Sequence, residues 1–413
     1  MWFYNLGIFF IGLAIKLSSI KKAKAKLWVS GRKNWRTILS AKVSKLKAEK
    51  IIWVHCSSYG EFEQGRPVIE AFKKQHPTVK IVLSFFSPSG YEAFKNWDGA
   101  DVVCYLPLDT KQNATDFLNI VNPSIAIFIK YEFWLNFLFQ LHKKAIPTFL
   151  ISAVFKPHQP FFKWYGGIFK KALSTYKLLL IQDEASGKLL ETIHIKNYKV
   201  VGDTRFDRVF DILKTKKELP LIDSFCANNK ILVVGSSWPK DEQIVIEAFK
   251  KLKVKHNNLK LIIAPHEVNK ASVANIEKLI GTVNYTLYTN PINIDKADVL
   301  IIDTIGVLSQ LYRYATATYI GGGFNDGIHN ILETLVYNVP VAFGTNHHKF
   351  VEATETLQFG ISKVVSNEGD LFLFFDKIIA DENYRNKLST EIKNYMQNKS
   401  GATEKILGEL KAI

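Results

Sequence analysis

The sequence alternates short, almost wholly apolar segments with segments of helical pattern, and this alternation occurs in two series. In the first series the strand-like segments occupy 51–55, 80–86, 102–106, 124–129, 146–151 and 177–181. In the second they occupy 230–235, 259–264, 299–302, 318–320, 339–343 and 361–365. Continuous apolar strands separated by helices are typical of parallel sheets covered by helices on both faces. We therefore predict an α/β protein of two Rossmann-like, doubly wound domains.

Ligands of such sheets bind beyond the carboxyl ends of the strands, so we expect the two domains to face each other across a cleft. A length of 413 residues exceeds one ordinary core, and a hydrophobic content of 47% with 22% charge is that of a folded chain throughout. The expected segments are a hydrophobic membrane anchor (1–20), a basic membrane-proximal segment (21–48), an N-terminal domain (49–206), a C-terminal domain (207–390) and a C-terminal helix that packs on the N-terminal domain (391–413).

The N-terminus concentrates the charge of the chain. Residues 1–15 contain no charged side chain, and residues 1–50 carry ten lysines and two arginines against the single Glu49, which is +11 of the net +16. Fifteen helical residues span about 22 Å, short of the ~20 residues that a full crossing needs, so a short crossing and an interfacial anchor are both open. A secretory signal peptide fits less well, because no basic segment precedes the apolar run.

The basic residues beside this apolar run predict a location on the cytosolic side of a membrane. A nucleic-acid-binding arm would explain the charge but not the apolar residues before it. Three cysteines, Cys56, Cys104 and Cys226, lie far apart and form no metal-ligand spacing. We therefore expect a reduced compartment and no metal site.

In the first series, polar residues follow the ends of strands. Glu61 follows the strand 51–55 through Ser58 and Gly60, in the first turn of a predicted helix. A carboxylate at this edge can accept a proton from a substrate hydroxyl, although Glu in a first helical turn is also a common capping residue. Two further turns share the edge, and their candidate residues are Ser89, Gly90 and Glu132.

The strand ends of the second series supply a second group of candidates. The segment 235–237 reads Gly-Ser-Ser between a strand and a helix, which is typical of a phosphate cradle. The ends of two other strands contribute Pro265, His266, Ile305 and Gly306. None of these motifs is specific by itself, and their convergence on one edge is the stronger signal.

The segment 319–333 is the most informative of the second series. A strand runs into three glycines, a turn and a predicted helix, so backbone N–H groups and the helix dipole would meet an anion there. Asn330 and Glu333 are three residues apart and would share one helix face beside His329, which suits the recognition of a ribose and a base. A tight connection without a ligand is the alternative.

The order and spacing of these motifs resemble those of the Kdo transferases, the 3-deoxy-D-manno-octulosonic acid transferases of lipopolysaccharide synthesis, from the N-terminal anchor to beyond Phe350. The similar segments are 58–61 (S-V-G-E in the family), 87–90 (T-P-T-G), 105–109 (Y-L-P-x-D), 132–136 (E-(L/I)-W-P-N), 202–207 (G-N-x-K-F-D), 235–237 (G-S-T), 303–306 (D-T-x-G) and 327–333 (G-G-H-N-x-L-E).

This resemblance implies a GT-B glycosyltransferase that moves Kdo from CMP-Kdo to a lipid A precursor, lipid IVA, with inversion and without a metal or cofactor. Glu61 would be the catalytic base, and Ser58, Gly60, Ser89, Gly90 and Glu132 would lie on the acceptor side. The CMP-Kdo donor would contact Gly235, Ser236, Ser237, Pro265, His266, Ile305, Gly306, His329, Asn330 and Glu333. The enzyme would be anchored on the cytoplasmic side of the cell inner membrane, with no nucleic acid partner.

Five positions depart from the family pattern. His266 replaces an arginine that contacts the donor phosphate, so the anion contact is weaker or depends on protonation of the imidazole. The other departures are Lys130 for an acidic residue, Leu135 and Thr345 for prolines, and Ile328 for a glycine. Another GT-B nucleotide-sugar enzyme, a UDP-sugar transferase or epimerase, and a non-enzymatic basic membrane-binding protein are the alternatives.

Overall fold

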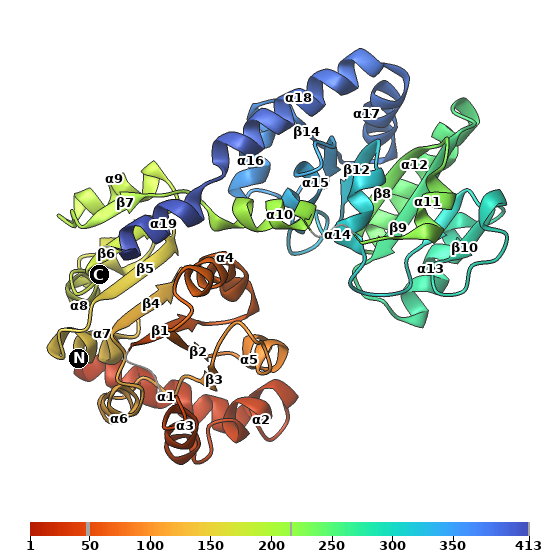
Figure 1. Ribbon diagram of the computed structural model, residues 1–413. Helices are drawn as coiled ribbons and strands as arrows, with labels where there is room; N and C mark the ends of the chain where they lie inside the picture. The colour runs from red at the N-terminus through yellow and green to blue at the C-terminus, as the bar shows by residue number, and fades with distance from the viewer. Residues whose placement is uncertain (47–49, 215–216, 412–413) are drawn as a thin grey trace. The chain divides into compact units, whose positions relative to one another are not determined.

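The computed structural model describes residues 1–46, 50–214 and 217–411 (Figure 1). The chain divides into two compact units. We call Met1–Arg208 together with Lys399–Ile413 the N-terminal unit, and Val209–Asn398 the C-terminal unit.

The N-terminal unit contains a seven-stranded sheet of order β3-β2-β1-β4-β5-β6-β7, in which each neighbouring pair is parallel. Its strands are β1 (Ile51–Cys56), β2 (Lys80–Phe85), β3 (Val102–Tyr105), β4 (Ile125–Ile129), β5 (Thr148–Ala153), β6 (Leu178–Ile181) and β7 (Tyr198–Val200). The helices are α1 (Trp2–Ser18), α2 (Ala23–Ser30), α3 (Trp35–Val43), α4 (Tyr59–Gln75), α5 (Pro88–Phe94), α6 (Lys111–Val121), α7 (Leu135–Lys143), η1 (Pro160–Phe162), α8 (Gly167–Leu173), α9 (Glu184–Thr192) and α19 (Ala402–Lys411), with α10 (Thr204–Lys214) leading out of the unit.

The C-terminal unit contains a second seven-stranded parallel sheet, of order β10-β11-β9-β8-β12-β13-β14. Its strands are β8 (Lys230–Ser237), β9 (Leu259–Pro265), β10 (Tyr285–Leu287), β11 (Val299–Ile301), β12 (Ala317–Ile320), β13 (Val341–Phe343) and β14 (Ser362–Val364). The helices are α11 (Pro220–Cys226), α12 (Pro239–Lys255), α13 (Lys270–Ile280), η2 (Ile294–Lys296), α14 (Leu308–Leu311), η3 (Tyr312–Tyr314), α15 (Leu332–Leu335), α16 (Val351–Gln358), α17 (Glu368–Ala380) and α18 (Glu382–Lys399).

The prediction of two parallel-sheet α/β domains is confirmed. Each predicted strand is present, with ends that shift by at most about two residues. Two strands, β7 and β10, are not predicted; both have three residues and lie at the sheet edges, and of their side chains only that of Thr286 is buried. The apolar pattern that identified the central strands is absent there, because an edge strand is covered on fewer sides.

The core of the N-terminal unit has one apolar cluster on each face of the sheet. Trp53 of β1 is fully buried on one face, where its ring contacts those of Phe117, Phe128 and Phe137. The cluster on the other face includes side chains of α4 and of α19, the dark blue helix that returns to this unit in Figure 1. The carboxylate of Asp207 accepts the backbone N–H groups of Gly401 and Thr403, both at 2.6 Å, and so caps α19.

Helix α1 is docked on the N-terminal unit through one face. The hydroxyl of Tyr4 donates to Asp109 (2.5 Å) and accepts the N–H of Leu135 (3.3 Å), while the amide of Asn136 donates to the side chain of Asn5 (3.0 Å). On the opposite face apolar side chains are exposed: Trp2, Phe3, Phe9, Phe10, Ile11 and Leu17. One face of α1 is therefore covered by protein and the other is exposed, although almost every residue of the helix is apolar.

Helices α1 and α2 are the candidates for a membrane-spanning segment. Within the described ranges no single helix is both long and apolar enough to cross a bilayer. Helices α1 and α2 satisfy the criterion only when taken together, and they are bent by 119° at the break between them.

Asp109 makes the contacts that join α1 to the rest of the unit. Besides Tyr4, it accepts the N–H groups of Asn136 (3.1 Å) and Phe137 (3.0 Å) at the start of α7, and it is fully buried. We expect Asp109→Ala to cost about 2–4 kcal/mol, because three buried donors lose their acceptor, whereas Tyr4→Phe should cost about 1 kcal/mol. Hydrogen exchange of the α1 amides should accelerate in both variants, and more in Asp109→Ala.

Tyr165→Phe is the matched control, because the Tyr165 ring is exposed. Exchange in α1 as slow in Asp109→Ala as in the wild-type protein would show that Asp109 does not hold this helix.

Candidate active site

In each unit, two of the loops that carry candidate residues leave the neighbouring strands at which the strand order reverses. In the N-terminal unit this point lies between β1 and β4, and in the C-terminal unit it lies between β8 and β12. Loops that leave neighbouring parallel strands on the two sides of a reversal part from each other and leave room for a ligand. Glu61 follows β1 and Glu132 follows β4, so the structure brings these two predicted residues to one edge of the first sheet.

Glu61 is half-buried in the first turn of α4, and its carboxylate accepts a short hydrogen bond from the hydroxyl of Ser58. Ser58 is the N-cap residue of α4, yet its side chain caps no backbone N–H group. The reciprocal hydrogen bonds of a capping box are therefore not formed, and capping does not account for Glu61. The other carboxylate oxygen accepts no hydrogen bond from the described residues.

Glycine is required at position 90 but not at position 60. A Cβ atom at Gly90 would lie 2.3 Å from the Phe85 ring and 3.0 Å from the backbone of Ser58, so this turn packs directly on the loop that carries Glu61. A Cβ atom at Gly60 would meet nothing within 4 Å. Ser89 is exposed, and its N–H group is accepted by the side chain of Ser87 (3.3 Å).

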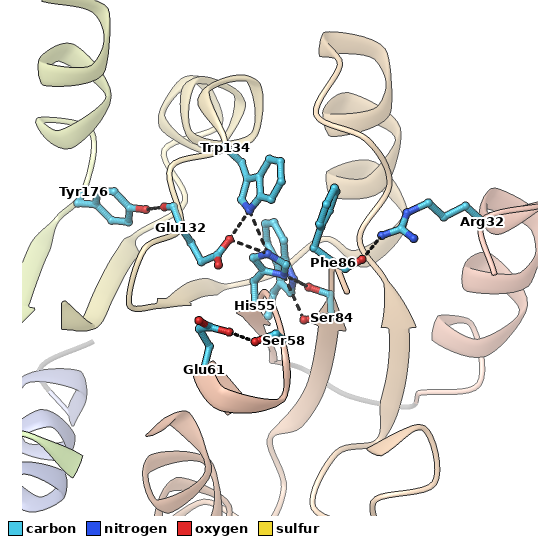
Figure 2. A network of polar contacts seen from close by, with 10 residues as sticks. Arg32, His55, Ser58, Glu61, Ser84, Phe86, Glu132, Trp134 and Tyr176 are labelled. Atoms are coloured by element: carbon cyan, nitrogen blue, oxygen red, sulfur yellow. Dashed lines mark hydrogen bonds and ion pairs between the residues drawn. The ribbon is translucent and has the colours of Figure 1, made fainter. Parts of the chain in front are cut away.

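Glu132 belongs to a buried polar network that also contains His55 and Trp134 (Figure 2). Oε2 of Glu132 lies 3.1 Å from Nε2 of His55 and accepts a short hydrogen bond from the indole N–H of Trp134. The backbone oxygen of Glu132 accepts the hydroxyl of Tyr176 (2.5 Å). The sequence does not single out His55, because a lone histidine inside an apolar strand is usually an ordinary core residue.

The thiol of Cys56 interacts electrostatically with both Glu61 and Glu132. Its thiol is fully buried, and burial, with smaller contributions from Glu132 and Glu61, raises the pKa of Cys56 well above its usual range. The thiol therefore stays protonated at neutral pH and is no candidate for a nucleophile.

In the C-terminal unit the three glycines after β12 serve close backbone packing. A Cβ atom on Gly321 would lie 2.3 Å from the backbone oxygen of Ser236, and one on Gly323 would lie 2.6 Å from the backbone of Gly344. Ser236 itself is left-handed, with φ 53°, at a bulge between β8 and β9. Gly321 thus packs on the Gly-Ser-Ser segment, and Gly323 packs on the loop after β13.

The sequence does not single out Asp241. Its side chain links this glycine turn to the start of α12. Its buried carboxylate accepts the N–H groups of Gly322 (2.9 Å) and Trp238 (3.0 Å) and the hydroxyl of Tyr319 (2.7 Å). Burial raises the pKa of Asp241, and these donors act in the opposite direction.

Three aromatic rings stack beside this turn. The ring of His266 stacks on Trp238 (centroid distance 4.8 Å) and on His329 (4.4 Å), both nearly parallel to it. The indole N–H of Trp238 donates to Nε2 of His329 (3.2 Å). Burial, with a smaller contribution from His266, lowers the pKa of His329 to about 4, so this imidazole is neutral at neutral pH. His266 is exposed and adjoins Pro265, the buried last residue of β9.

Asn330 and Glu333 are close together but do not share a helix. The helix α15 begins only at Leu332 and has four residues, so the expectation that both residues lie on its first turn is wrong. Asn330 precedes the helix, accepts the N–H of Leu332 (3.1 Å) and donates to Glu333 (3.2 Å).

Ile305 and Gly306 are the remaining predicted residues, and they lie in the loop after β11. Ile305 is 82% exposed, and Gly306, with φ 87°, has open space around it. Across the described ranges no group of three or more His, Cys, Asp or Glu side chains is arranged to hold a metal ion.

Comparisons with known proteins agree on one family. Residues 33–208 match the family model of 3-deoxy-D-manno-octulosonic-acid transferase (kdotransferase). The 3-deoxy-D-manno-octulosonic acid transferase of Aquifex aeolicus is 28% identical over 324 residues, which are 78% of this chain and 83% of that protein. That of Haemophilus influenzae is 26% identical over 377 residues, which are 87% of this chain and 86% of that protein.

Among solved structures, the UDP-GlcNAc 2-epimerase of Neisseria meningitidis, bound to UDP-GlcNAc, superposes with a TM-score of 0.64 over 88% of this chain and 100% of that chain. Its sequence identity is 16%, so this likeness concerns the fold alone. The family model and the sequence relatives therefore show that the chain is similar to Kdo transferases, which are glycosyltransferases, over most of its length.

Proposed function

We propose that this protein transfers Kdo from CMP-Kdo to a hydroxyl of a lipid A precursor, lipid IVA, with Glu61 as the general base. The observation that carries this proposal is the state of the Glu61 carboxylate. It lies at the carboxyl edge of the first sheet, it receives the Ser58 hydroxyl, and it takes no part in capping α4. A carboxylate so placed can accept a proton from an acceptor hydroxyl.

The reaction is an inverting displacement. The acceptor oxygen attacks the anomeric carbon of Kdo as its proton moves to Glu61, and the bond from that carbon to the phosphate oxygen of CMP breaks. CMP leaves with the electron pair of the broken bond. Backbone N–H groups of 235–237 and the His266 ring would stabilise the charge of the phosphate, which supports a mechanism without a metal ion.

The donor residues would divide between base, ribose and phosphate. Asn330 and Glu333 present an amide and a carboxylate side by side, as hydroxyl and base recognition requires. Ile305 and Gly306 would line the base pocket from the rim. His329 stays neutral, so it offers hydrogen bonds rather than charge.

We also propose that α1 anchors the protein on the cytoplasmic side of the inner membrane as an interfacial helix. One face of α1 is hydrogen-bonded to the N-terminal unit, which favours an interfacial position over a crossing, and the other face exposes large apolar side chains. Basic residues that follow the helix would attract anionic lipid by about 1 kcal/mol each.

Glu61→Gln should lower turnover about 10²–10⁴-fold, because the amide cannot accept the proton. Transfer of Kdo from CMP-Kdo to lipid IVA, followed by mass spectrometry, measures this loss, and UDP-sugars in parallel reactions test the alternative donor class. Glu70→Gln is the control on the same helix, where Glu70 only pairs with Arg66 at the surface. Near-normal turnover in Glu61→Gln would rule out this base.

Glu333→Ala should weaken CMP binding about ten- to a hundredfold, the loss expected for a hydrogen bond to a charged group. Isothermal titration with CMP measures the affinity. Glu382→Ala removes an exposed glutamate of the same unit and should leave it unchanged. Unaltered affinity in Glu333→Ala would reject its role in donor binding.

Replacing Phe3, Phe9 and Phe10 together by Ser should move the protein from the membrane fraction to the soluble fraction, because these exposed rings supply much of the apolar face of α1. Cosedimentation with vesicles that contain anionic lipid measures binding. Val254→Ser with Leu373→Ser, two exposed apolar residues of the C-terminal unit, is the matched control. Undiminished vesicle binding of the triple variant would place the anchor elsewhere.

A further inference from the structure

Glu132 is a buried carboxylate without a lysine or arginine partner among the described residues. Its side chain is 3% exposed and that of its partner His55 is fully buried. An isolated buried carboxylate is costly, so a charge or several donors must balance it. The groups that approach Oε2 are His55 and Trp134 (Figure 2).

The surroundings of His55 fix the proton on Nδ1. This atom lies 3.1 Å from the backbone oxygen of Ser84 and 2.9 Å from its hydroxyl. A backbone oxygen can only accept a hydrogen bond, so Nδ1 must carry the hydrogen. The Ser84 hydroxyl is held in turn by the indole N–H of Trp53 (2.8 Å).

Nε2 of His55 and Oε2 of Glu132 lie 3.1 Å apart. The single indole N–H of Trp134 is within hydrogen-bonding distance of both atoms, 3.1 Å from Nε2 and closer to Oε2. The three side chains therefore form one cluster, in which His55, held at Nδ1 by Ser84, fixes the position of Oε2.

This arrangement occupies only one oxygen of Glu132. Within the described residues, Oε1 accepts no hydrogen bond, while the backbone of Glu132 is held by Tyr176. The other titratable groups around the pair are Glu61, Cys56 and Tyr176, and burial raises the pKa of both Cys56 and Tyr176, so both are neutral at neutral pH. Oε1 is thus a rigidly held acceptor on the same edge of the sheet as Glu61.

We propose that His55 is a positioning residue for glycosyl transfer: it fixes the orientation of Glu132, so that Oε1 accepts a hydroxyl of the acceptor sugar while Glu61 deprotonates the attacking hydroxyl. The inference rests on the proposed function, because it assigns the acceptor to this edge. It adds a binding role for Glu132 and a residue, His55, that touches no substrate.

Two substitutions of His55 test the two nitrogen positions of the imidazole separately. The amide nitrogen of Gln reaches about as far as Nε2 and keeps a donor to Glu132, whereas that of Asn reaches only the position of Nδ1 and keeps the contact with Ser84. We expect His55→Asn to lower kcat about 10²-fold, as a misplacement of about 1 Å can do, and His55→Gln to stay within about tenfold of wild type. Both should bind CMP as the wild-type protein does.

Equal losses of kcat in the Asn and Gln variants, or wild-type kcat in His55→Asn, would overturn the positioning role. Melting temperature and CMP affinity, measured on the same samples, separate these outcomes from a failure to fold. Wild-type protein that binds CMP and transfers no Kdo would instead overturn the proposed function.

Discussion

The parallel direction of all neighbouring strands is the constraint on which the rest of this structure depends. Because each strand is followed by a helix that returns the chain to the start of the next strand, every loop after a strand opens on the same edge of its sheet. The reversal of strand order between β1 and β4, and again between β8 and β12, then separates two loops at that edge. Short motifs that are unspecific in sequence thus become neighbours.

Buried carboxylates hold the loops at these edges, and they do so without salt bridges to lysine or arginine in the described residues. Asp109 accepts two amides at the start of α7 and the hydroxyl of Tyr4, and Asp241 accepts two backbone N–H groups and the hydroxyl of Tyr319. Oriented N–H and O–H donors stabilise a buried anion where a flexible cation would leave it partly unsatisfied. Glu132 follows the same principle, with His55 as its partner.

The polar contacts of α1 show that the apolar N-terminal segment has one covered face and one exposed face. A composition of aromatic and aliphatic residues suggested a membrane segment, and it could not reveal that Tyr4 and Asn5 would bind groups at the start of α7. These contacts decide which face of α1 is covered and which face is exposed. The exposed face, rather than the whole segment, is what remains for a lipid surface.

The sequence by itself determined the two parallel sheets, because the apolar central strands are buried on both faces and their composition reports that burial directly. It also identified Glu61, Glu132 and the glycine turn as candidates, since strand ends are visible in the pattern. Only the tertiary structure decided that His55, an apparently ordinary residue of β1, meets Glu132, and that His266 stacks on both Trp238 and His329. Such contacts join residues that are distant along the chain, and local periodicity carries no information about which side chains a fold brings within hydrogen-bonding distance.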